Sequence, residues 1–318
     1  EDGDVLEWWT DLDRTVQSFK RFSTRDADTL QRWHDAFLPI VEQILIPEAQ
    51  SPPLPEEERH RLLSNTSSGR LLLEVSELSP LGFVQKEFEH PVIQAGLLFF
   101  NGLREVDLRC PGFGHHIPAL LASTGKAQMC LGGSAALARA LVSSVEETGG
   151  TVRLQTAPKR ILVESDRVVG VETVSGERIK ARYFVASGLN PHQTFLDLLD
   201  EKDVPDAWRK KVKGFQYNLI APLFGLNLYL SEPLRFDAAA RHPELDDAYM
   251  VILGLNDVDD YLAMVKAHVE GKQPPAIMWG SCPTLFDPSQ APEGKHTAFM
   301  WQKMPYSLQA DPANWDRE

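Results

Sequence analysis

The chain has 318 residues and a formal net charge of −13, with 43% hydrophobic and 24% charged residues. This composition is that of a globular protein long enough for two domains, or for one large α/β domain with insertions. The acidity argues against a nucleic-acid partner, whose phosphates would be repelled, and no apolar run approaches the roughly 20 residues that cross a bilayer.

The first residues and the cysteines bear on the cellular compartment. The chain opens at Glu1 without Met and without the basic and apolar regions of a signal peptide. The three cysteines form no Cys-x-x-Cys pair and have no histidine nearby at metal-ligand spacing. We therefore expect a cytoplasmic protein without a disulfide framework and without a metal site.

The first 100 residues predict a mainly helical region. Residues 4–10 predict a strand that carries two tryptophans, and residues 12–46 place their apolar side chains at helical spacing. Ser23 can cap the start of a helix, because its hydroxyl accepts a hydrogen bond from an otherwise unpaired amide. After a proline-rich break at residues 52–55, further helices are expected over residues 56–100.

The stretch that follows begins with a turn and a helix. Gly132 and Gly133 predict a tight turn, and Ser134 is placed to cap the next helix. An apolar residue every fourth position gives that helix one narrow face that can pack on a sheet. Gly149 ends it, since a left-handed cap favours a residue without a β-carbon. The apolar repeat consists of Leu137, Leu141 and Val145.

Short strands separated by turns come next. Residues 165–166 and 175–176 are suitable hairpin turns. Residues 183–186 form a continuous apolar run, as is typical of a strand buried on both faces, and a loop of small residues follows it. The other strands are expected at residues 152–156, 160–164, 168–174 and 178–181.

Beyond residue 199 the pattern indicates a separate mixed sheet with its own helical cover. Its strands are expected at residues 219–230, 277–281 and 297–303, and its helix at residues 257–270.

Residues 132–199 resemble a known family in an ordered series of short motifs. The run GGSAALARAL at residues 132–141 is similar to the Gly-Gly-x-x-x-Leu-x-x-Ala-Leu segment of phytoene dehydrogenases and their relatives. A weaker similarity covers most of the remaining chain, and DPSQAPEG at residues 287–294 is similar to the family's Asp-Pro-Ser-x-Ala-Pro-x-Gly loop. The branch of pyridine nucleotide-disulfide oxidoreductase domain-containing proteins fits best. The motifs after the first are GGTVRL at 149–154, KRILVE at 159–164, VVGVE at 168–172, SGERIKA at 175–181 and residues 184–199.

The resemblance implies an α/β flavoprotein with a partial FAD-binding domain, Rossmann-like and of the glutathione-reductase type, and an α+β substrate domain. Residues 131–205 would belong to the FAD-binding domain. Residues 1–130 would form the mainly helical part of the substrate domain, and residues 206–318 its mixed-sheet part. The family's G-x-G-x-x-G unit and its C-terminal segment are not recognisable in this sequence, so we expect either that the chain is a fragment or that it is one part of a cofactor site completed elsewhere.

Four of the residues that the resemblance places near FAD precede the strand expected at residues 160–164. Gly132 and Gly133 match a segment near the flavin, although they could serve only to start the helix. Pro158 and Lys159 match the strand that presents backbone groups to the adenine end. Proline has no N–H to donate, and Pro158 could equally end an edge strand.

The loop after the expected buried strand carries the remaining two, Ser187 and Gly188. Ligands of open α/β sheets bind at the carboxyl ends of strands, and small residues allow a diphosphate or ribityl chain to approach. The alternative is an ordinary turn between a strand and a helix.

No catalytic residue can be named from the sequence. His115 and His116 lie in a glycine-flanked stretch, but neighbouring histidines on a strand point to opposite faces, which favours a surface or packing role. Six aromatic residues would line an apolar tunnel or, alternatively, belong to the core. They are Trp8, Trp9, Phe99, Phe100, Trp279 and Trp301.

The resemblance thus implies an FAD-dependent oxidoreductase in which a substrate C–H bond gives its hydride to the flavin. An amine-oxidase-like flavoenzyme and a non-catalytic interaction subunit that has lost FAD remain as alternatives. The expected partner is a small, apolar organic substrate, with no nucleic acid. Contact with a membrane surface and assembly into a homo-oligomer stay open.

Overall fold

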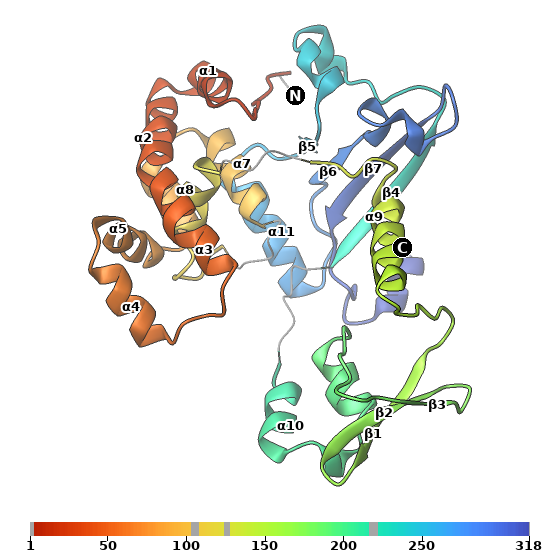
Figure 1. Cartoon of the computed structure of the whole chain (residues 1–318). Coiled ribbons are helices and arrows are strands. Elements are labelled where there is room, and N and C mark those ends of the chain that lie inside the picture. Colours follow the sequence, from red (N-terminus) through yellow and green to blue (C-terminus); the bar gives the residue numbers. More distant parts are fainter. Residues whose placement is uncertain (1–2, 103–107, 124–127, 216–221, 318) are drawn as a thin grey trace. The chain divides into compact units, whose positions relative to one another are not determined.

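The computed structural model describes residues 3–102, 108–123, 128–215 and 222–317 (Figure 1). The chain forms two compact units. Unit 1 comprises Glu1–Gly133 together with Asn218–Glu318, and unit 2 comprises Ser134–Tyr217. The assignment of residues 131–205 to an FAD-binding domain, and of residues 1–130 and 206–318 to a substrate domain, stays a prediction.

The helical part of unit 1 begins with two capped helices, α1 (Leu12–Phe22) and α2 (Thr24–Ile40). As predicted, the Ser23 hydroxyl caps α2 by accepting a hydrogen bond of 3.0 Å from the Asp26 amide. The expected strand at residues 4–10 is wrong. The amides of Glu7 and Trp9 donate to side chains of α1 instead of to a neighbouring strand.

Four of the remaining helices of this region, α4 to α7, confirm the prediction for residues 56–100, and two more lie outside that range. They are α3 (Ile46–Ala49), α4 (Glu56–Ser64), α5 (Ser67–Ser76), α6 (Pro80–Glu87), α7 (Pro91–Gly102) and α8 (His116–Leu121), with a π-helical turn at Val41–Leu45.

The second part of unit 1 is a four-stranded sheet in the order β4-β7-β6-β5. The predicted strands are present, but the prediction of a mixed sheet is wrong, because every described strand pair is antiparallel. β5 was not predicted, and residues 219–221 of the first expected strand lie outside the described residues. The strands are β4 (Leu223–Leu230), β5 (Val251–Leu253), β6 (Met278–Ser281) and β7 (His296–Lys303).

The two parts of unit 1 share one hydrophobic core. Helix α11 (Val258–Glu270) confirms the helix predicted at residues 257–270, and it buries Tyr261 and Met264 in the same cluster as residues of α2 and α7. Trp279 of β6 belongs to that cluster too. The helices and the sheet therefore share part of their core, and α11 lies between the sheet and the other helices (Figure 1).

Unit 2 contains an antiparallel three-stranded sheet in the order β1-β2-β3, together with helices α9 and α10. Ser165 and Asp166 adopt φ of 47° and 61° in the first hairpin, which confirms the predicted turn. The elements are α9 (Ser134–Glu147), β1 (Pro158–Glu164), β2 (Arg167–Thr173), β3 (Arg178–Lys180) and α10 (Asp206–Lys213).

Three predictions for unit 2 are wrong. Residues 152–156 and 183–186 are not strands, and the apolar face of α9 is exposed rather than packed on a sheet. Tyr183 and Phe184 are 74% and 75% exposed. A strand of a parallel sheet needs neighbours on both edges and helices on both faces, and the described part of unit 2 supplies neither to this segment.

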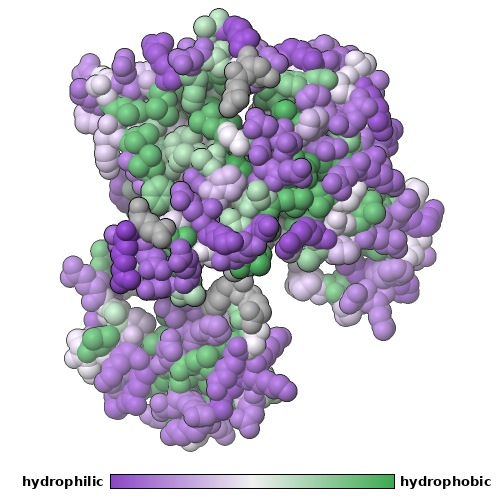
Figure 2. Space-filling view, turned by 180° about the vertical axis from the view of Figure 1, so that it is seen from behind, coloured by the Kyte–Doolittle hydropathy of each residue, from purple (hydrophilic) through white to green (hydrophobic). Residues whose placement is uncertain are grey.

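The face of the molecule in Figure 2 is mostly hydrophilic, and hydrophobic residues reach it in several patches. Among the described helices, none combines the length and the apolar character that a membrane span requires. Short 3₁₀ or π turns complete the structure at Gln193–Asp197, Glu201–Asp203, Asp237–Ala240, Pro243–Asp247, Pro283–Leu285, Pro288–Gln290 and Pro312–Asp316.

Candidate functional site

The predicted glycine turn is present in unit 1, and the protein itself already uses its amides. Gly132 and Gly133 have φ of 78° and 74°, a conformation that a residue with a β-carbon rarely adopts. The Gly133 amide donates to the Cys130 carbonyl at 3.0 Å, and the Gly132 amide donates to Asp287 Oδ2 at 2.6 Å. The turn therefore has no amide left over for a cofactor phosphate.

Asp287 connects this turn to a second loop. Its carboxylate also accepts from the Ser289 hydroxyl at 2.6 Å and from Gln290 Nε2 at 3.1 Å. The Ser289 hydrogen bond, followed by that of the Gly132 amide, holds the pKa of Asp287 below its usual value. In the sequence, this loop is noticeable only for its likeness to a family motif. The signal for its role is the order Asp-Pro-Ser, in which an Asp side chain can accept from the amide two residues later.

In unit 2 the predicted adenine-side residues begin β1. Pro158 is the first residue of this edge strand, a position that does not require its missing N–H. Lys159 Nζ lies 3.4 Å from Glu172 Oε1, so its ammonium is engaged by a carboxylate. A contact of Lys159 with a nucleotide would therefore need its backbone or the loss of this ion pair.

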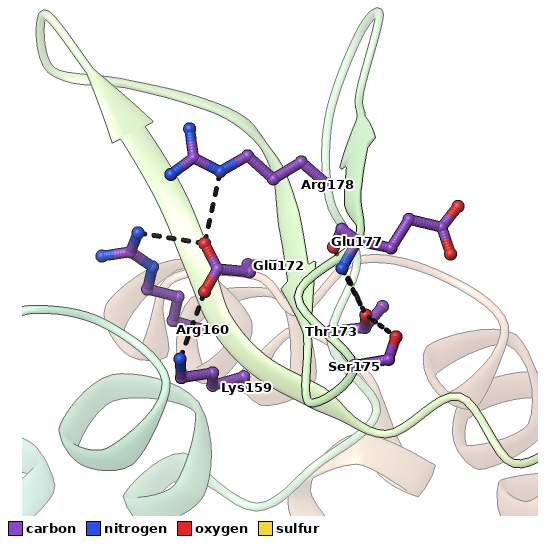
Figure 3. A network of polar contacts seen from close by, with 7 residues as sticks. All are labelled: Lys159, Arg160, Glu172, Thr173, Ser175, Glu177 and Arg178. Atoms are coloured by element: carbon purple, nitrogen blue, oxygen red, sulfur yellow. Dashed lines mark hydrogen bonds and ion pairs between the residues drawn. The ribbon is translucent and has the colours of Figure 1, made fainter.

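Glu172 collects three basic side chains on the sheet of unit 2 (Figure 3). Arg160 Nη2 and Arg178 Nε lie 3.0 Å and 3.3 Å from Glu172 Oε2, in addition to Lys159. The hydrogen bond from Arg160 is the main reason that the pKa of Glu172 lies below its usual value. Three cations around one carboxylate leave this cluster with net positive charge, on a chain that is acidic overall. The cluster around Glu172 was not predicted from the sequence, because the three strands that carry it meet only in the fold.

Ser187 and Gly188 follow an exposed segment without regular secondary structure instead of the expected buried strand. The Ser187 hydroxyl lies 2.7 Å from Thr194 Oγ1 and accepts from the Leu189 amide at 3.3 Å. Within the described part of unit 2, the amides of residues 183–188 donate to no other protein group, and no hydrogen bond joins Ser187 or Gly188 to the start of β1. This loop thus offers backbone donors that the glycine turn lacks.

The predicted aromatic residues of unit 1 form a row that runs from the core to the surface. Phe99 meets Trp279 edge-on at 5.3 Å between ring centroids, and Trp279 meets Trp301 at 6.1 Å. Phe299, which was not predicted, continues the row at 4.6 Å from Trp301. Trp279 is 3% exposed and Trp301 is 37% exposed. The inner members are core residues, while Trp301 presents an apolar surface.

The other aromatic candidates serve packing near the start of the chain. Trp8 contacts Phe100 at 5.5 Å, and the Arg14 guanidinium lies 3.2 Å above the centroid of Trp9.

His115 and His116 lie at the start of α8, not on a strand. Their rings therefore meet edge-on at 4.7 Å instead of pointing to opposite faces, which corrects the prediction. Ser76 Oγ lies 2.8 Å from His115 Nδ1. Burial, with smaller contributions from His116 and Arg59, lowers the pKa of His115 to about 4. The geometry supports the packing role.

The lowered pKa of His115 predicts how the stability of the fold depends on pH. Its pKa is about 4 in the fold and about 6.5 in an unfolded chain, so only the unfolded chain takes up this proton between those values. We expect stability to fall as the pH drops from about 6.5 to about 4, by up to about 3 kcal/mol from this residue. Urea unfolding measured across that pH range checks it. H115Q should lose less stability than the parent over the same range, and equal slopes would contradict the assignment.

One group in unit 1 has the donor types of a metal site. Glu7, His242 and Glu244 each offer a ligand atom, and these atoms lie within 4.8 Å of one another. The Glu7 carboxylate, however, already accepts from Arg21 Nη2 at 2.6 Å and from Trp9 Nε1 at 2.9 Å. Sequence spacing could not reveal this group, because its members are far apart in the chain. The expectation of no metal stays a prediction.

Comparison with known proteins adds relatives but no family profile, since no protein-family model matches the chain. A limonene dehydrogenase component from Castellaniella defragrans is 26% identical over 303 residues, which are 92% of this chain and 55% of that protein. Pyridine nucleotide-disulfide oxidoreductase domain-containing protein 2 from Mus musculus is 29% identical over 212 residues, 62% of this chain and 36% of that protein. A neurosporene-forming phytoene desaturase from Cereibacter sphaeroides is 27% identical over 190 residues, 58% of this chain and 34% of that protein.

The resemblance drawn from the sequence motifs is thereby confirmed. The chain spans about half the length of the first of these relatives and little more than a third of the other two.

Proposed function

Because this chain belongs to the phytoene dehydrogenase-like oxidoreductases, we propose that it forms part of an FAD-dependent enzyme that removes a hydride from a substrate C–H bond. Two of the relatives are named as a dehydrogenase component and a desaturase, and both names describe oxidations. The chain spans about half of the first relative, so the activity of the whole protein belongs to the proposal.

The observation that carries the proposal is the segment of residues 183–188. It is exposed, begins with the apolar run of residues 183–186 and has no regular secondary structure, and its amides donate to no group in the described part of unit 2. Such a segment is typical of a strand whose neighbours are missing. The exposed apolar face of α9 likewise indicates a surface whose packing partner is missing. We infer that unit 2 contributes to a Rossmann-like sheet that another segment of the protein, or another protein chain, completes.

The residues present fit FAD unequally. Ser187 and Gly188 fit best, because free amides and small side chains suit the approach of a diphosphate. Gly132 and Gly133 fit only as a rigid turn, since both amides are engaged. Pro158 has no N–H, so the adenine contact expected at this position would have to involve neighbouring backbone groups.

In this proposal, the flavin supplies the hydride acceptor when it is bound, and the protein positions the reactants and excludes water. The loop at Ser187 and Gly188 would bind the cofactor through its backbone. A small, apolar organic substrate is also part of the proposal. No side chain is assigned as a base, because none is demanded when the flavin takes the hydride. A cytoplasmic location and self-association are further parts of the proposal.

The test is flavin binding by the full-length protein. We expect the purified parent to carry FAD, seen as visible flavin absorption and released on denaturation. Gly188→Glu places a bulky carboxylate where the diphosphate would approach, and it should weaken FAD binding by at least about tenfold because like charges repel. Ser143→Glu adds the same charge at an exposed position of α9, outside the apolar repeat of Leu137, Leu141 and Val145, and serves as the matched control.

The outcomes separate the proposed roles. A parent that binds no flavin would favour the non-catalytic interaction subunit. Equal FAD affinity of G188E and S143E would remove the loop from the site while leaving the flavoprotein assignment intact. An amine-oxidase-like activity would appear as oxidation of amines and not of hydrocarbons by the flavin-loaded protein.

A further inference from the structure

Unit 1 contains a pocket that none of the predicted site residues lines. Its volume is about 390 Å³, within the range of about 300–1,000 Å³ that is usual for small-molecule sites. It lies where β4 ends and β7 begins, beside the loop that Asp287 organises. The lining residues are Tyr229, Leu230, Ser231, Gln290, Ala291, Pro292, Lys295, His296 and Thr297.

The charge of this pocket differs from that of the chain. Its lining contains Lys295 and His296 but no aspartate or glutamate, although the chain carries 45 acidic residues. No ion pair of Lys295 is found in the part of the chain that the structure describes. The hydroxyls of Ser231 and Thr297 are further donors. An unpaired ammonium beside hydroxyl groups selects for an anion.

Two of the polar lining residues are held in place by hydrogen bonds with residues outside the pocket. His296 Nδ1 lies 3.0 Å from Thr284 Oγ1, which fixes the orientation of the imidazole ring. Gln290 Nε2 donates to Asp287 Oδ2 at 3.1 Å. Residues whose positions are set before binding lose less entropy when a ligand arrives, so the site is preorganised.

Beside the pocket, β7 places aromatic side chains on one face of the sheet. Thr297, Phe299 and Trp301 alternate along β7 and therefore share one face of the sheet. Tyr229, which is opposite Thr297 on β4, lies on that face as well. From Thr297 to Trp301 the strand spans about 13 Å, the length of a medium hydrocarbon chain. Polar donors at one end and aromatic rings along the rest match an amphipathic ligand.

We propose that this face of unit 1 binds an amphipathic organic anion. Its acidic group enters the pocket beside Lys295 and His296, and its apolar chain lies along Phe299 and Trp301. The inference does not depend on flavin binding, because every residue in it belongs to unit 1.

Isothermal titration of the full chain with decanoate, decyl phosphate and decanol tests the proposal. Decanoate and decyl phosphate carry the acidic group on the same apolar chain, and decanol lacks the charge. We expect both anions to bind at least about tenfold more tightly than decanol, since a hydrogen bond to a charged group is involved. The tighter of the two anions identifies the head group as a carboxylate or a phosphate.

Variants localise the binding. Lys295→Gln should weaken the binding of decanoate by about tenfold. Lys20 is an exposed lysine of α1, and Lys20→Gln should change the affinity for decanoate less than about twofold. Trp301→Ala should weaken decanoate and decanol alike, and circular dichroism of each variant verifies its fold. Equal affinities for decanoate and decanol, or equal effects of K295Q and K20Q, would overturn the proposal. So would the absence of decanoate binding.

Discussion

Replacing Trp279 by alanine is expected to lower the free energy of unfolding of unit 1 by about 3–5 kcal/mol. Its ring is 3% exposed and contacts Phe99 on the helical side and Trp301 on the sheet. The substitution removes apolar burial and leaves a cavity that the surrounding helices and strands only partly fill. The loss arises at the junction of helices and sheet, so both should unfold at lower urea concentration.

Trp301→Ala is the matched control, because Trp301 is a tryptophan of the same row that is 37% exposed. Its removal should cost less than half as much, since much of its surface already contacts water. Urea unfolding followed by far-ultraviolet circular dichroism gives both values. Similar losses for the two variants would mean that Trp279 is not the residue that joins the two parts of the core.

Replacing Asp26 by alanine is expected to lower the free energy of unfolding by about 3–6 kcal/mol. The Asp26 carboxylate is fully buried and accepts the amides of Glu89 and His90, both at 2.9 Å. Alanine would leave two amides without their acceptors inside the protein, where an unsatisfied donor loses its hydration without compensation.

Asp28 lies on the same helix, is exposed, and provides the control for the general loss of a carboxylate near the start of α2. Asp28→Ala should change stability by no more than about 0.5 kcal/mol. Hydrogen exchange adds a local readout, because the amides of Glu89 and His90 should exchange faster in D26A. Unchanged exchange at these two amides would contradict the proposed role of Asp26.

Local signals in the sequence were sufficient for most helices and for the hairpins. The Ser23 cap, the proline-rich break at residues 52–55 and the turn at Ser165 and Asp166 act within a few residues, so the chain carries the relevant interactions wherever it folds. The family resemblance likewise followed from an ordered series of short motifs, and the relatives confirm it.

Tertiary structure alone decided which apolar segments find partners and which polar groups meet. Residues 183–186 have the composition of a buried strand, but burial depends on neighbours that composition does not supply. The Asp287 contact with Gly132 joins residues 155 positions apart, and the Glu172 cluster needs three strands in register. Such contacts depend on the path of the whole chain, because a side chain reaches only a few ångströms from its own backbone.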